Sequence, residues 1–186
     1  MESEMESELA AQVADLRSRL EALEQNAPGN KLSMVVFSGD LDKALAAFII
    51  ATGAAAMGME VMMFFTFWGT PLLRDPEAKA LGKDLMGTMF GAMLPRGAAR
   101  AKLSKMHFGG LGTAMMRGLM KQKNVASLDQ LIALAAEMDV KICICDLSMS
   151  LMGFAREEMI NYPDLKYCGV ATFLEAAQGS KIQLFL

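Results

Sequence analysis

The folded part of this chain opens with Leu32-Ser-Met-Val-Val-Phe-Ser-Gly-Asp40, and an Ala-rich segment follows at about residues 41–57. The first six of these residues are mostly apolar and β-prone, Ser-Gly-Asp is typical of a turn, and the Ala-rich segment favours a helix. The order predicts a strand, a tight turn and a helix. This is the repeating unit of an α/β domain.

The same alternation continues along the rest of the chain. Its pattern predicts strands at 60–67, 140–145 and 181–186, and helices at about 127–138 and 172–177. Each predicted strand is almost uniformly apolar, which is typical of a parallel sheet with both faces covered by helices. We therefore expect an α/β fold with three layers and a mainly parallel sheet.

The 186 residues suffice for one domain with a sizeable core, which we place at residues 31–186. Residues 1–30 form a separate amphipathic helix and linker, because apolar residues recur there at spacings of 4, 3, 4 and 3 and the pattern stops at Asn26-Ala-Pro-Gly-Asn30. Such a short coiled-coil seam is marginal alone and is expected to reinforce a homo-oligomer. The alternative is a helix that packs on its own domain. The seam residues are Leu9, Val13, Leu16, Leu20 and Leu23.

Composition narrows the class of protein further. The net charge of −3 disfavours a nucleic-acid binder. The hydrophobic fraction of 53% and the 18 methionines indicate an oligomer or contact with a membrane. The apolar run at 44–68 is long enough for a membrane span, but Gly53, Gly58 and Glu60 divide it into a helix, a turn and a strand. We expect a cytoplasmic protein with three free thiols, since its three cysteines form no disulfide framework.

A basic insert occupies about residues 85–125. It contains seven Lys or Arg residues, no acidic residue, and many Gly and Met residues. We expect it to dock an acidic partner protein or to cover the reactive site, and peripheral membrane contact is the less favoured role. The alternative is a solvated basic surface. The docking residues proposed are Arg117, Lys121 and Lys123.

Cys145 is the main candidate for chemistry. It ends the predicted strand at 140–145, and ligands of parallel sheets bind at this carboxyl edge. Free N–H groups there stabilise a thiolate or a persulfide anion. The turn that follows contains Asp146, Ser148 and Gly153, of which the first two are expected to cap it. The alternative is a buried, inert thiol.

The sequence gives less evidence of a chemical role for the other two cysteines. Cys143 lies on the same side of its strand as Cys145. A disulfide between the two is disfavoured because their Cα atoms are close to the upper limit of the usual separation. We therefore expect Cys143 to pack in the core. Cys168 is a possible resolving or second carrier thiol, if it lies at the same sheet edge as Cys145. With one His, His107, and no C-x-x-C motif, no metal site is expected. No cofactor is expected either, because Ser38-Gly39-Asp40 lacks the glycine pattern of a nucleotide-binding turn.

Several segments resemble one family. Cys145-Asp-Leu-Ser-Met-Ser-Leu-Met-Gly153 is similar to the Cys-x-Met-Ser-Met-x-x-Met-Gly segment of DsrE2-type proteins in the DsrE/DsrF/DsrH-like superfamily, with Leu147 in place of the first Met. Further similar segments are Phe64-Phe-Thr-Phe-Trp-Gly69, Leu103-Ser-Lys-Met106, Gly109-Gly-Leu-Gly-Thr-Ala-Met-Met116 and Gly169-Val-Ala-Thr-Phe-Leu174. The resemblance spans roughly residues 31–186.

The resemblance implies a flavodoxin-like fold, a homo-oligomer, and a sulfur carrier or sulfurtransferase that works with TusA-like and rhodanese-like proteins. Its carrier cysteine falls on Cys145. We therefore expect a sulfur-relay protein that holds sulfane sulfur as a persulfide on Cys145 and exchanges it with protein thiols. The alternatives are a non-catalytic oligomeric scaffold and a peroxiredoxin-like thiol protein, which would need Cys168 as a resolving cysteine.

Overall fold

A computed structural model describes residues 2–25, 27–78 and 85–186 of the chain. Within these residues five strands form one sheet in the order β4-β3-β2-β1-β5, and each neighbouring pair runs parallel. The α/β fold with a mainly parallel sheet is therefore confirmed. The strands are β1 (Gly29–Val36), β2 (Glu60–Phe65), β3 (Lys141–Cys145), β4 (Lys166–Cys168) and β5 (Ser180–Phe185).

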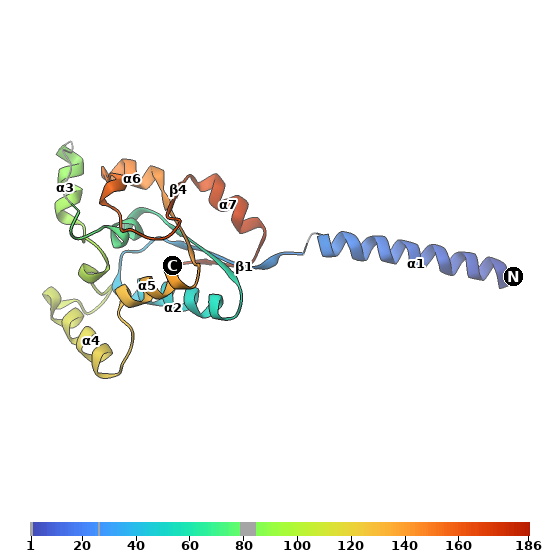
Figure 1. Ribbon diagram of the computed structural model, residues 1–186, viewed down its shortest axis with the longest axis horizontal. Coiled ribbons are helices and arrows are strands. Elements are labelled where there is room, and N and C mark those ends of the chain that lie inside the picture. Colours follow the sequence, from blue (N-terminus) through green and yellow to red (C-terminus); the bar gives the residue numbers. More distant parts are fainter. Residues whose placement is uncertain (1, 26, 79–84) are drawn as a thin grey trace.

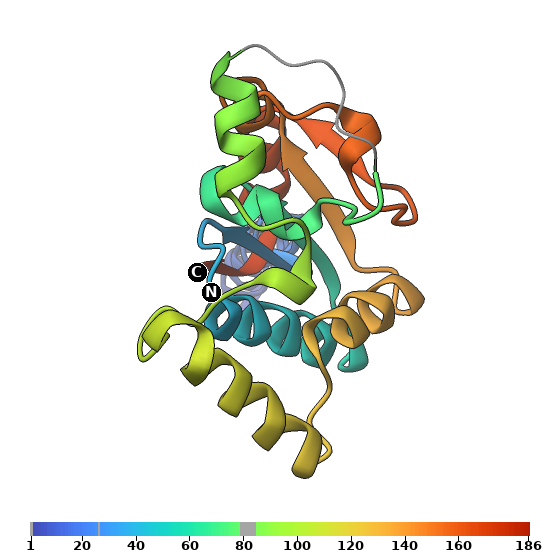
Figure 2. The same cartoon turned by 90° about the vertical axis from the view of Figure 1, so that its left-hand side faces the viewer.

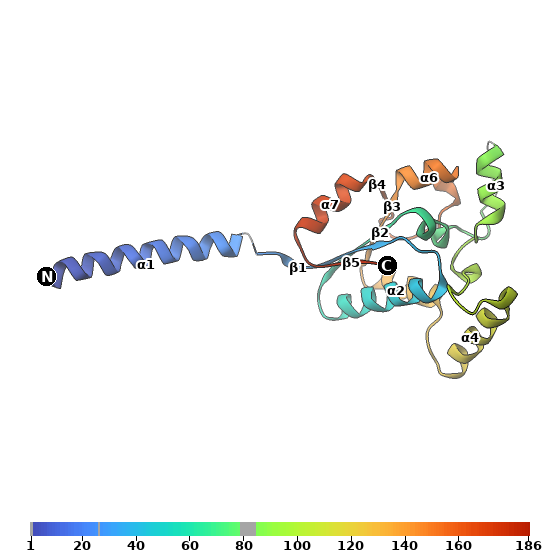
Figure 3. The same cartoon turned by 180° about the vertical axis from the view of Figure 1, so that it is seen from behind.

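Helices cover both faces of the sheet. Helices α2 and α5 lie on one side, and α6 and α7 lie on the other (Figures 1 and 3). The α-helices are α1 (Glu2–Gln25), α2 (Leu41–Ala56), α3 (Leu85–Met93), α4 (Leu111–Gln122), α5 (Leu128–Glu137), α6 (Asp146–Met152) and α7 (Val170–Gln178). Short 3-10 turns are η1 (Phe67–Leu73), η2 (Ala98–Arg100), η3 (Phe108–Gly110) and η4 (Arg156–Glu158).

The pleat of the strands separates two cores. On β3, Ile142 and Ile144 belong to the large core that includes α2 and α5. Cys143 and Cys145 alternate with them and point to the smaller core, which also contains Phe173 of α7. Successive strand residues point to opposite faces of a sheet, so this division follows directly from the sequence of β3.

Helix α1 extends away from the domain (Figures 1 and 3). Its apolar seam is exposed, from 39% at Val13 to 70% at Leu23. The alternative in which this helix packs on its own domain is therefore wrong. Among the described residues, none of the helices combines the length and the apolar character that crossing a bilayer would require.

The basic insert divides between the two sides of the sheet. Helix α3 packs against α6, whereas α4 lies on the side of α2 and α5, at the opposite end of the view in Figure 2. The part of the insert that contacts α6 is therefore α3, and α4 does not form the cover over Cys145 that was one expectation for the insert. The strand predicted at 60–67 ends at Phe65, because η1 begins at Phe67.

Candidate functional site

Cys145 is the last residue of β3 and the N-cap residue of α6. Its side chain is 5% exposed, and its thiol is free. The strand end places the sulfur at the carboxyl edge of the sheet, as the sequence predicted. Helix α6 has only seven residues, so its macrodipole is a minor contribution, and the groups that contact the sulfur decide its chemistry.

Thr66 and Ser148 form a hydroxyl pair beside this sulfur. Their oxygens are 2.9 Å apart, and Ser148 Oγ also accepts a hydrogen bond of 2.8 Å from the Phe67 backbone N–H. If one hydroxyl donates to the other, the second hydroxyl still has its own proton to donate. The pair therefore supplies one O–H donor to the sulfur, whichever way it is oriented.

The surroundings favour the thiolate of Cys145. Burial is the largest single influence and raises the pKa of the thiol, but hydrogen bonds together outweigh it and hold the pKa below its ordinary value. The groups that lower the pKa are the Ser148 and Leu147 backbone N–H groups and the hydroxyls of Ser148 and Thr66, one of which donates to the sulfur while the other donates to its partner hydroxyl. A thiolate is the nucleophilic form of cysteine, so this environment activates the sulfur. The sequence motif located Ser148, but Thr66 was not among the predicted site residues.

The backbone near Thr66 is held in an unusual conformation. Phe67 has a positive φ of 44°, which costs a non-glycine residue about 1–3 kcal/mol. The hydrogen bond from its N–H to Ser148 fixes this conformation. Two glycines let the adjoining loops approach each other, because a Cβ at Gly39 would overlap Trp68 O and one at Gly69 would overlap Val36 O.

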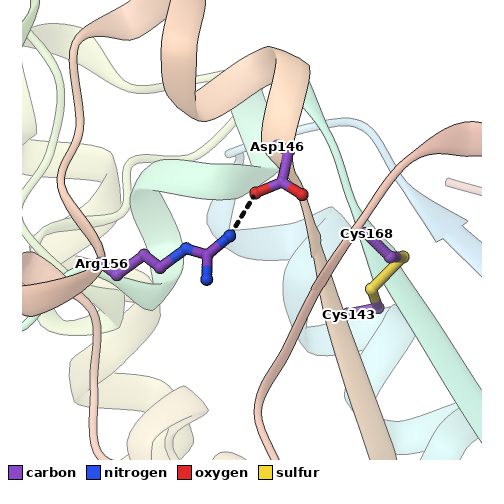
Figure 4. The surroundings of a disulfide bond; sticks show 4 residues. All are labelled: Cys143, Asp146, Arg156 and Cys168. Carbon is purple, nitrogen blue, oxygen red and sulfur yellow. Dashed lines mark hydrogen bonds and ion pairs between the residues drawn. A yellow bond between two sulfur atoms is a disulfide. The ribbon is translucent and has the colours of Figure 1, made fainter.

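The other turn residues stabilise the start and the end of α6. Asp146 forms an exposed ion pair of 3.1 Å with Arg156 (Figure 4). The Arg156 guanidinium also lies 4.5 Å from the centre of the Tyr167 ring. Gly153 ends α6 with φ 63° and ψ 36°, a left-handed conformation that glycine adopts without strain. Asp146 thus pairs with a side chain instead of capping the helix as predicted.

The remaining two cysteines are joined. Cys143 and Cys168 form a disulfide with a Cα separation of 6.2 Å (Figure 4). The prediction of three free thiols is wrong. Cys143 is buried in the smaller core, as expected, but it is also bonded to Cys168. The cause is β4, a three-residue strand that the sequence pattern did not reveal. It pairs with β3 so that Cys168 lies directly beside Cys145, at the same sheet edge.

The turn at the end of β1 is occupied by its own polar groups. It borders a pocket of about 410 Å³ whose lining also includes Trp68 and Lys102. Asp40 accepts a hydrogen bond of 2.9 Å from Ser38 and pairs with Lys43 at 2.9 Å. The Leu41 N–H, at the start of α2, donates to Lys102 O at 2.7 Å. A carboxylate and a carbonyl thus hold the groups that a phosphate-binding turn would offer to its ligand.

The proposed docking residues lie apart from Cys145. Arg117 is in α4 and donates to Ala101 O at 3.0 Å, Lys121 is in the last turn of that helix, and Lys123 is its C-cap. In the part of the chain that the structure describes, no group of three or more His, Cys, Asp or Glu side chains is arranged to hold a metal ion.

The fold and the site together define the class of the protein: a three-layer α/β protein with a reactive cysteine at the carboxyl edge of its parallel sheet. The chain belongs to the DsrE/DsrF/DrsH-like family, which it matches over residues 28–185. The resemblance noted in the sequence is thereby confirmed.

Two relatives cover most of the same region. An uncharacterized protein of Bacillus subtilis (strain 168), YrkE, is 45% identical over 156 residues, which are 84% of this chain and 96% of the relative. The sulfur carrier protein DsrE2 of Allochromatium vinosum is 36% identical over 163 residues, which are 84% of this chain and 98% of the relative.

Proposed function

We propose that this protein is a sulfur-relay protein that carries sulfane sulfur as a persulfide on Cys145. The observation that carries the proposal is the free Cys145 thiol with its lowered pKa, surrounded by the donors of Thr66, Ser148 and Leu147. These donors stabilise negative charge on sulfur, and both the resting thiolate and a persulfide are anions. The sulfur carrier protein DsrE2 among the relatives supports the same role.

The relay consists of two exchange steps. The Cys145 thiolate attacks the outer sulfur of a donor persulfide, the donor leaves as a thiolate, and a persulfide forms on Cys145. A thiolate of the acceptor then attacks that outer sulfur, and Cys145 leaves as a thiolate. Neither step needs an oxidant or a metal, and a leaving thiol of low pKa speeds the second step. We propose TusA-like and rhodanese-like proteins as the donor and acceptor, in the cytoplasm.

Apolar side chains near the site are suited to contact such a partner. Phe67 and Trp68 of η1 are 39% and 47% exposed, and Leu147 and Leu151 of α6 are 62% and 58% exposed. The backbones of Phe67 and Leu147 both contact the Cys145–Ser148 region. An exposed apolar rim around a nearly buried sulfur is the arrangement expected where a partner excludes water during transfer.

The relay is tested by intact-mass measurement after treatment with a persulfide donor. A chain in which Cys145 is the only cysteine (Cys143→Ser, Cys168→Ser) is expected to gain about 32 Da, because its thiolate reacts. The matched variant Cys145→Ser, with its disulfide intact, is expected to gain nothing. Equal loading of the two proteins would refute the assignment of Cys145.

We further propose that the basic residues of α4 guide an acidic partner. Replacing all three by Gln is expected to slow sulfur transfer from a protein donor and to leave loading by inorganic polysulfide unchanged, because attraction between exposed charges acts on association. The residues are Arg117, Lys121 and Lys123. The matched control removes the same charge elsewhere, at the exposed positions Lys141, Lys166 and Lys181. Equal slowing by both triple variants would argue against α4 as the docking site.

A further inference from the structure

All three cysteines of the chain share one small area of the sheet. Cys143 and Cys145 point to the same face of β3, and Cys168 reaches that face from β4. Residues Cys143 and Cys168 are only 1% and 9% exposed, so bulk solvent has little access to their sulfurs. The neighbours that enclose the cluster under α7 are Phe64, Phe173 and Ala177.

The strand register brings Cys168 within reach of both other cysteines. It is bonded to Cys143 across a Cα separation of 6.2 Å. It is also the direct partner of Cys145 in the β3–β4 ladder. Neighbouring strands lie about 4.8 Å apart, and disulfides form at Cα separations of about 4.4–6.8 Å. Cys168 can therefore bond to either cysteine of β3 without moving a strand.

We propose that Cys143 and Cys168, when reduced, act as an internal dithiol that releases the sulfur carried on Cys145 as sulfide. This persulfide reductase activity rests on the proposed function, since it needs a persulfide on Cys145. The sulfur carried on Cys145 would then have two fates: transfer to a partner thiol, or reduction and release as sulfide.

The proposed reaction has two exchange steps that balance. The Cys168 thiolate attacks Sγ of the Cys145 persulfide, and the bond between the two sulfurs of the persulfide breaks. The outer sulfur takes the electron pair of that bond and leaves as sulfide. A Cys145–Cys168 disulfide results. The Cys143 thiolate then attacks Sγ of Cys168, and Cys145 leaves as a thiolate. In total two thiols are oxidised to the Cys143–Cys168 disulfide, the outer sulfur is reduced to sulfide, and the thiol of Cys145 is restored.

The surroundings of the three sulfurs favour this direction. The thiolate that leaves in the second step is Cys145, which Ser148 and Thr66 stabilise by hydrogen bonds. A better stabilised thiolate leaves faster in thiol–disulfide exchange. The structure contains the bond pattern of the product, with Cys143 joined to Cys168 and Cys145 free. The redox state of the pair thus selects between holding sulfur and releasing it.

The test compares oxidised and reduced wild-type protein, so its main arm needs no substitution. Each form is freed of reductant, given one equivalent of glutathione persulfide without oxygen, and sampled for sulfide and for intact mass. Reduced protein is expected to release about one sulfide per chain and to acquire the Cys143–Cys168 disulfide, as the stoichiometry of exchange requires. Oxidised protein is expected to keep an adduct of about 32 Da and to release none.

Two variants separate this inference from the relay itself. Reduced Cys168→Ser is expected to load Cys145 and to keep the adduct, and reduced Cys143→Ser is expected to release sulfide and stop at the Cys145–Cys168 disulfide. A stable adduct on reduced wild-type protein, together with normal loading of Cys168→Ser, would overturn the reductase and leave the relay standing. No adduct on either Cys168→Ser or oxidised wild type would overturn the relay. A persulfide on Cys168 in the Cys143→Ser variant would overturn the order of the steps.

Discussion

The hydroxyl pair of Thr66 and Ser148 leads to a prediction about the reactivity of Cys145. The two oxygens are 2.9 Å apart, and Ser148 is also held by the Phe67 N–H at 2.8 Å. Because the pair supplies one O–H donor to the sulfur in either orientation, the loss of one hydroxyl leaves the other free to turn its proton to the thiolate. The two single variants, Ser148→Ala and Thr66→Val, are therefore expected to have smaller effects than their combination.

The size of the effect follows from the strength of the lost hydrogen bond. A hydrogen bond to a charged group contributes about 1.5–3 kcal/mol, and one pKa unit corresponds to about 1.4 kcal/mol. The double variant is therefore expected to raise the pKa of Cys145 by about one to two units. Each single variant is expected to raise it by less than about one unit, and the two shifts to add to less than the shift of the double variant.

The assay is the rate of alkylation of Cys145 by iodoacetamide as a function of pH, with the other cysteines kept as a disulfide. The thiolate is the reactive species, so the rate is level above the pKa and falls about tenfold per pH unit below it. A raised pKa moves this profile to higher pH. Ser150→Ala, an exposed serine of the same helix, is the control and is expected to leave the profile unchanged. A double variant with the wild-type profile would refute the role of the pair.

Three further predictions concern stability and assembly. Arg74 and Glu158 form a buried ion pair at 3.3 Å, so Glu158→Ala is expected to lower the free energy of unfolding in urea by about 3–5 kcal/mol. A decrease of less than about 1 kcal/mol would contradict a structural role for the pair. Tyr162→Phe removes a buried hydrogen bond of 2.7 Å to Val140 O and is expected to cost about 1 kcal/mol in the same assay, with unchanged stability as the opposing result. Deleting residues 1–28 is expected to leave a discrete oligomer in light scattering, because a seam of fewer than three heptads is too short to hold chains alone; a monomer would mean that this helix supplies the main contact.

The local pattern of the sequence was sufficient for strands β1, β2, β3 and β5, for helices α1, α2, α5 and α7, and for the central residue of the site. Uniformly apolar strands can be recognised from their own residues, and so can a helix start such as Ser127, which caps α5 at the beginning of the helix predicted at 127–138. Cys145 was identified because one short segment shows both the end of a strand and the turn that follows it, and Cys145 lies between them. Strand β4 was missed because three residues give too short a run for any periodicity to appear.

The neighbours of Cys145 were decided by the tertiary structure. Thr66 and Ser148 are 82 positions apart in the chain, and Cys143 and Cys168 are 25 apart. Their contacts depend on which strands lie side by side and in which register, and a shift of one residue would turn Cys168 to the opposite face of the sheet. The sequence by itself determined which residues can do thiol chemistry, and that Cys143 and Cys145 lie on one face of β3. Only the packing of β4 beside β3, and of η1 against α6, determined which of them meet, because those contacts join segments whose separate patterns carry no information about each other.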